Sequence, residues 1–151
     1  MRIAFLFNHD QLHQVAHSLP IALALARRPD FTGEIIIATT SEAMATEVLR
    51  LGAPLVGTRI QHVHLALKPS SRRIARLLGS IAPAAKVLVY KDNLDFFRSL
   101  DVMVVAEKTS LILRRAHGLT RPLLVHTRHG AGDRAIGFDK HSAGFDHVLC
   151  S

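Results

Sequence analysis

Short apolar runs alternate with longer segments of helical periodicity along the whole chain. Six runs have the length and composition of strands, at residues 3–7, 34–39, 59–65, 101–106, 122–126 and 145–150. The first is apolar throughout, as expected of a strand buried on both faces. Helices are predicted at 12–28, at 41–52, from the 68–71 turn to Gly79, at 83–99 and at 109–117. In the first of these, Pro20 either kinks the helix or starts a second one.

Alternating strands and helices predict an α/β fold, namely one Rossmann-like, doubly wound domain with a parallel sheet over residues 1–151. Folds of this class bind ligands in the crevice at the carboxyl ends of their strands. The segments that follow predicted strands, at 8–10, 39–41, 107–109 and 127–137, are therefore the first places to look for a site. The chain stops directly after a predicted strand, which suggests the first half of a longer protein.

The amino-acid composition excludes some classes of function and favours others. The chain has 151 residues, of which 48% are hydrophobic and 21% charged, typical of a folded domain. A single Cys150, no apolar run of eighteen residues and no signal-peptide pattern favour a cytoplasmic protein without disulfides. The net charge of +7 favours phosphate-bearing partners. Aromatic residues make up only 5%, which argues against stacking on single-stranded nucleic acid.

The richest concentration of candidate chemistry is the loop 126–139. Gly130 and Gly132 let backbone amides approach an anion, Arg128 and Arg134 can neutralise phosphate, and His129 can accept a hydroxyl proton near neutral pH. We therefore take His129 as the candidate catalytic residue. The candidate substrate-binding residues of this loop are Arg128, Gly130, Asp133 and Arg134.

This loop resembles a motif of the CDP-glycerol glycerophosphotransferases, which include teichoic-acid polymerases and primases. In that family a His-Gly pair follows a core strand, a basic residue comes shortly after, and Gly-Phe-Asp closes the motif. His129-Gly130, Arg134 and Gly137-Phe138-Asp139 keep this order. The sequence departs from the family pattern at Arg128, where an aromatic residue is usual, and at residues 131–134.

The resemblance implies one half of a GT-B-like enzyme, in which two Rossmann-like domains face each other across a cleft. This chain would be the amino-terminal, acceptor-side domain, with His129 as general base, and would be inactive alone because a missing carboxy-terminal domain holds the CDP-linked or nucleotide-sugar donor. The acceptor would be lipid-linked or a glycan, in cell-surface polysaccharide or cell-wall synthesis, with no cofactor. A GT-B glycosyltransferase, a sugar-nucleotide epimerase relative, or a non-enzymatic basic module that binds nucleotide or nucleic acid remain alternatives.

Other histidines are secondary candidates. His9 and His13 follow the first strand and could contact substrate; with His17 they fall at helical spacing, but a metal would need a further ligand that is not evident. We therefore expect no metal site. His62 and His64 share one side of a predicted strand, where hydrogen-bonded core or edge positions are expected rather than metal binding.

Basic residues also gather on one predicted helix, where Lys68 is followed by Arg72, Arg73 and Arg76. A solvated helix face explains any one of them. Together they could place the domain on an anionic membrane surface, where each basic residue contributes about 1 kcal/mol. Peripheral attachment to the inner face of the membrane is the corresponding expectation, and nucleic acid is not an expected partner.

Overall fold

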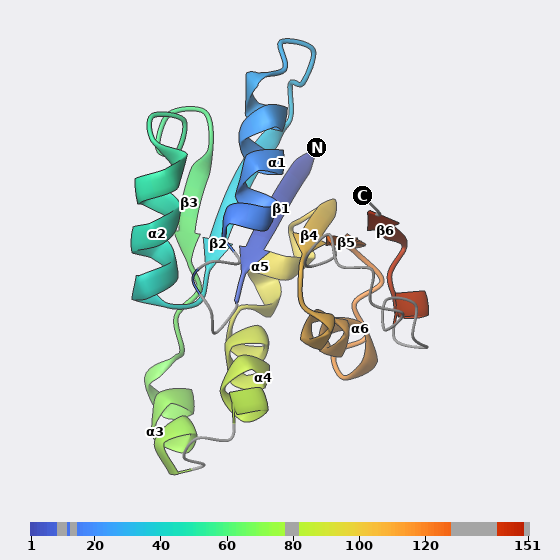
Figure 1. Cartoon of the computed structure of the whole chain (residues 1–151). Coiled ribbons are helices and arrows are strands. Elements are labelled where there is room, and N and C mark those ends of the chain that lie inside the picture. Colours follow the sequence, from blue (N-terminus) through green and yellow to red (C-terminus); the bar gives the residue numbers. More distant parts are fainter. Residues whose placement is uncertain (9–11, 13–14, 78–81, 128–141, 150–151) are drawn as a thin grey trace, which may run out of the picture.

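The computed structural model is a six-stranded parallel sheet with helices packed on both faces (Figure 1). It describes residues 1–8, 12, 15–77, 82–127 and 142–149. The strands are β1 (Arg2–Phe7), β2 (Glu34–Thr39), β3 (Gln61–His64), β4 (Val102–Val105), β5 (Leu123–Thr127) and β6 (His147–Leu149). The helices are α1 (Val15–Arg27), α2 (Glu42–Gly52), α3 (Pro69–Leu77), α4 (Ala82–Asp92), α5 (Leu94–Arg98) and α6 (Ile112–Arg115), with 3₁₀ turns η2 (Lys108–Leu111) and η4 (Ser142–Gly144).

The strand order is β3-β2-β1-β4-β5-β6, and every neighbouring pair is parallel. The chain moves outward from β1 to β3, then returns to the other side of β1 to form β4. The order therefore reverses between β1 and β4, which is where doubly wound sheets open a crevice. The predicted Rossmann-like α/β class is confirmed.

Strand β1 supplies residues to both hydrophobic cores. Ile3, Phe5 and Phe7 pack in the core under α1 and α2, whereas Ala4 and Leu6 pack on the opposite face under α4 and α5. Successive residues of a strand point to opposite faces, so an uninterrupted apolar run fits a strand covered on both sides. The continuous apolarity of residues 3–7 has this physical origin.

The strand predictions are confirmed to within a few residues, but several helix predictions need correction. Pro20 lies inside α1 and does not start a second helix. The predicted helix at 83–99 divides into α4 and α5 at Asn93, whose side-chain amide donates to the carbonyls of Val89 and Ala66. An asparagine that bonds nearby carbonyls competes with the helical backbone, which explains the break.

Two further differences lie at helix ends. The segment 68–71 is not a separate turn, because α3 already begins at Pro69. The predicted helix at 109–117 is a 3₁₀ turn followed by the short α6. This helix ends at Arg115, three residues before Gly118, the expected stop, which has φ +61°. In the described part of the chain, no helix is both long and apolar enough to cross a membrane.

Candidate functional site

A pocket of about 370 Å³ opens at the carboxyl ends of β1, β2 and β3. Asn8 follows β1, Thr40 and Ser41 follow β2, and the segment after β3 forms a further wall. Helices α3 and α4 lie beyond this edge of the sheet and close the remaining side (Figure 1). Its lining residues are Asn8, Thr40, Ser41, His64, Leu65, Ala66, Leu67, Arg72, Ala85, Lys86, Val89 and Tyr90.

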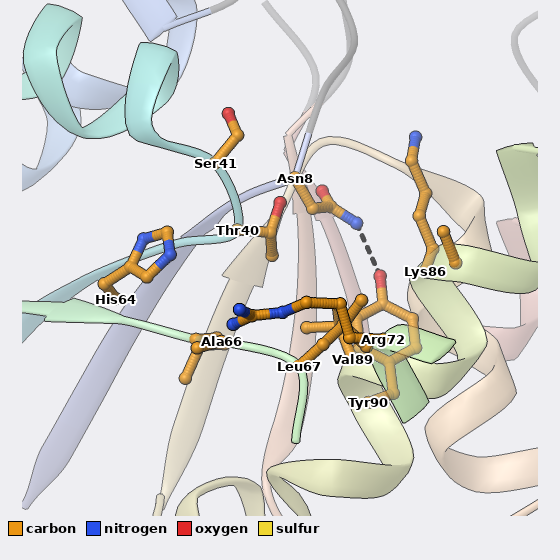
Figure 2. A pocket seen from close by; sticks show the side chains of 12 residues that line it. Asn8, Thr40, Ser41, His64, Ala66, Leu67, Arg72, Lys86, Val89 and Tyr90 are labelled. Atoms are coloured by element: carbon orange, nitrogen blue, oxygen red, sulfur yellow. Dashed lines mark hydrogen bonds between the residues drawn. The ribbon is translucent and has the colours of Figure 1, made fainter. Parts of the chain in front are cut away.

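A row of buried polar side chains, joined by hydrogen bonds, forms the inner wall of the pocket. Asn8, only 1% exposed, donates from Nδ2 to the hydroxyl of Tyr90 (Figure 2). That hydroxyl lies 3.5 Å from Ser110 Oγ. The phenol oxygen accepts from Asn8, and in the contact between Tyr90 and Ser110 either hydroxyl can be the donor. Asn8 Oδ1 is buried and accepts no hydrogen bond from the described residues. A buried amide oxygen without a donor is costly, so this atom marks a position where a ligand donor would be stabilised.

The Tyr90 phenol is held in its neutral form. Burial raises its pKa above the ordinary value of 10.0, against smaller opposing effects from hydrogen bonds to Ser110 and Thr109. The side chain is fully buried and also packs edge-on against Phe97, with ring centroids 5.7 Å apart. Tyr90 therefore acts as a fixed, uncharged hydrogen-bonding group that orients Asn8.

An ion pair lies beside these hydrogen-bonded side chains. Lys86 Nζ is 2.9 Å from Glu107 Oε2, and both side chains are less than one-fifth exposed. Thr109 donates to the same carboxylate oxygen at 2.9 Å. Glu107 follows β4, so this pair joins the end of β4 to α4 across the point where the strand order reverses.

The outer wall of the pocket carries positive charge. The Arg72 side chain extends over the pocket from α3, with His64 and Ser41 on the opposite side (Figure 2). Ser41 caps α2 by accepting from the amide of Met44. None of the described lining residues is acidic. The pocket is therefore suited to a ligand that combines an anionic group with hydroxyl or amide donors.

His62 and His64 both contact Thr39 from the edge strand β3. Thr39 Oγ1 is 3.0 Å from His62 Nε2 and 3.4 Å from His64 Nδ1. Burial lowers the pKa of His62, the nearby His64 lowers it further, and Glu42 opposes both effects. The prediction of hydrogen-bonded edge positions is confirmed. Among the residues that the structure describes, no three His, Cys, Asp or Glu side chains are grouped to hold a metal ion.

The end of β5 is fixed by buried hydrogen bonds. His126 Nε2 donates to the carbonyl of Ala106, and its ring stacks on Phe145 with centroids 4.6 Å apart. Thr127 Oγ1 donates to the carbonyl of Val105 and lies 2.9 Å from Ser18 Oγ of α1. These contacts position the strand from which the loop with the candidate catalytic histidine departs.

The candidate residues chosen from the sequence lie outside the described residues. They are His129, Gly130, Arg134, Arg128, Asp133, His9 and His13. The expectation that segments after strands line a site is met at Asn8, Thr40 and Ser41. The sequence placed Arg72 on a solvated helix face or, together with its basic neighbours, on a membrane surface, and it did not point to Lys86 or Tyr90. One available signal was that Tyr90 is the only tyrosine and lies in a predicted apolar helix.

Neither a family model nor a curated protein nor a solved structure matches this chain.

Proposed function

We propose that this chain is the acceptor-side domain of a GT-B-like transferase similar to the CDP-glycerol glycerophosphotransferases. The transferase moves glycerol phosphate, or a related activated group, from a CDP-linked donor to an acceptor hydroxyl in cell-surface polymer synthesis. The observation that carries the proposal is the pocket at the carboxyl edge of the sheet, which offers a buried amide oxygen on one wall and a guanidinium on another.

In this proposal the pocket binds the acceptor. Asn8 Oδ1 accepts a hydrogen bond from an acceptor hydroxyl, and Arg72 pairs with an anionic group of the acceptor. The apolar wall of Leu65 and Val89 packs against the carbon skeleton. Oriented binding of this kind lowers the barrier of group transfer, since the reacting groups are already positioned.

The chemical step is assigned to His129 by its motif. His129 removes the proton from the acceptor hydroxyl, the oxygen attacks the β-phosphorus of the donor, and CMP leaves. The donor is held by a second domain in this proposal, so the chain alone binds acceptor analogues without turnover. The acceptor is lipid-linked or a glycan, and the domain works in the cytoplasm at the inner face of the membrane.

Acceptor binding is tested on the chain itself with glycerol 3-phosphate as probe, by isothermal titration calorimetry. Arg72→Ala is expected to weaken binding about tenfold, because a charge-assisted hydrogen bond is lost. Arg73→Ala is the matched control, since Arg73 is the next residue of α3 and does not line the pocket. An equal loss in both variants, or no binding by the wild-type chain, would contradict an acceptor site here.

The two-domain part of the proposal has its own test, which is the length of the native gene product. A continuation beyond Ser151 with about 150 further residues of strand–helix alternation supports it. In such a product, His129→Ala should lower kcat with CDP-glycerol by about a hundredfold. An unchanged kcat would remove His129 from the mechanism, without bearing on acceptor binding.

A further inference from the structure

Helix α3 presents both positive charge and apolar side chains to solvent. Arg72, Arg73 and Arg76 are exposed, and so are Ile74 and Leu77, whose exposed fractions are 47% and 87%. The helix contains no acidic residue, and no ion pair links its arginines to a carboxylate of the described residues. In Figure 1, α3 lies at the lower left, beyond the carboxyl edge of the sheet. Two exposed apolar side chains next to exposed guanidinium groups form a surface that can bind a partner with both negative charge and apolar groups.

The orientation of α3 is fixed by its contact with α4. Asp92, the last residue of α4, accepts from the Lys68 amide at 2.8 Å and from Ser71 Oγ at 2.9 Å. Ser71 is buried and Ala75, one turn later, is half-buried. These residues therefore mark the face of α3 that is turned toward the protein, and among the described residues the opposite face is exposed.

The outward face of α3 divides into two strips. Successive residues of an α-helix are about 100° apart, so Ile74 and Leu77, three residues apart, lie side by side. Arg73 is adjacent to Leu77 at a spacing of four and to Arg76 at a spacing of three. The outward face consequently carries an apolar strip flanked directly by guanidinium groups.

We propose that α3 docks this chain onto an anionic lipid surface. Leu77 and Ile74 enter the boundary between headgroups and acyl chains, while Arg73 and Arg76 pair with lipid phosphates beside them. A nucleic-acid backbone would satisfy the arginines but would leave the apolar strip in water, so a lipid surface fits both strips. The inference rests on the membrane location in the proposed function. It does not depend on the acceptor pocket, because Arg72, the arginine that lines the pocket, is not among the docking residues.

The test is binding of the chain to vesicles of equal parts phosphatidylcholine and phosphatidylglycerol, measured by cosedimentation. Replacing both Arg73 and Arg76 with glutamine is expected to weaken binding about thirtyfold at low salt. Leu77→Ser is expected to weaken it about tenfold, because the apolar contact is removed. Vesicles of phosphatidylcholine alone should bind the wild-type chain much more weakly, since they lack the net negative charge.

Two control variants separate docking by α3 from general attraction of a basic protein. Leu49→Ser changes a leucine of α2 that is 46% exposed, and Arg59→Gln removes an exposed charge before β3; both should bind vesicles like wild type. Thermal unfolding of each variant verifies that its fold is retained. Equal losses in the control and α3 variants would overturn the proposal. The absence of vesicle binding by the wild-type chain would also overturn it. Binding of duplex DNA that depends on Leu77 to the same extent would overturn it as well.

Discussion

At the scale of single residues, Tyr90 gives a direct view of the pocket wall. It is the only tyrosine, and the chain has no tryptophan, so its ionisation can be followed by ultraviolet absorbance without interference. Because burial raises the pKa of its phenol, the folded chain should ionise above the ordinary value of 10.0. The same titration in guanidinium chloride should return to that value, and a folded-state midpoint at or below it would contradict the buried network.

The raised pKa of Tyr90 makes the free energy of unfolding depend on pH, because the folded and unfolded states bind protons differently. Above pH 10.0 the unfolded chain loses the phenolic proton while the folded chain retains it. The unfolded state then binds fewer protons, so the free energy of unfolding falls as pH rises from that value upward. Tyr90→Phe removes this contribution, and it leaves Asn8 Nδ2 without its acceptor.

The pair His62 and His64 offers a second prediction at this scale, with opposite signs for two substitutions. His64→Gln should raise the pKa of His62, because a neighbouring positive charge is removed, and Glu42→Gln should lower it. Both are read from the imidazole resonances in an NMR pH titration. Since the pKa of His62 is depressed below 6.5, its contribution to stability is present above that pH and is lost as the pH falls. Shifts of the same sign in the two variants would exclude this electrostatic coupling.

At the scale of elements, Asp146 ties the edge strand β6 to its neighbours. Its Oδ2 accepts from the amide of Leu124 at 2.6 Å and from the guanidinium of Arg114. Burial raises the pKa of Asp146, but these two hydrogen bonds outweigh it and hold the pKa below the ordinary 3.8. The stabilisation is therefore present above that pH and is lost as acid protonates the carboxylate.

Asp146→Asn should accordingly lower the free energy of unfolding by about 1 kcal/mol at neutral pH, a modest value because solvent screens the pair. Denaturant unfolding measures this change. Asp95→Asn is the matched control, since its pairing with Arg98 lies on an exposed helix surface and should leave stability unchanged. A similar loss in both variants would show that β6 does not depend on this contact.

Elements were predictable wherever a local pattern determined them. The apolar, β-branched run at 34–39 has the bounds of β2, and Ser41 caps the following helix as its hydroxyl predicts. The division between α4 and α5 was not predictable, because the Asn93 amide reaches Ala66, which is distant in sequence. The helical periodicity of the sequence continues through Asn93, so the pattern does not indicate this contact.

At the scale of the whole molecule, only one side of the pocket could be foreseen. Parallel strands bring their carboxyl ends to one edge, which is enough to place Asn8, Thr40 and Ser41 together. Arg72, Lys86 and Tyr90 reach the same space because α3 and α4 fold beyond that edge, held by Asp92. This arrangement depends on tertiary contacts between α3 and α4, which neither composition nor periodicity reveals.

Because β1 contributes residues to both hydrophobic cores, the number of residues in this strand cannot easily change. Its odd-numbered residues serve one core and its even-numbered residues the other, so an inserted or deleted residue would exchange the two sets over the rest of the strand. Phenylalanines would then face the space shaped for Ala4. We therefore expect insertions and deletions to be tolerated in exposed connections, such as residues 28–30 before β2, and not in β1.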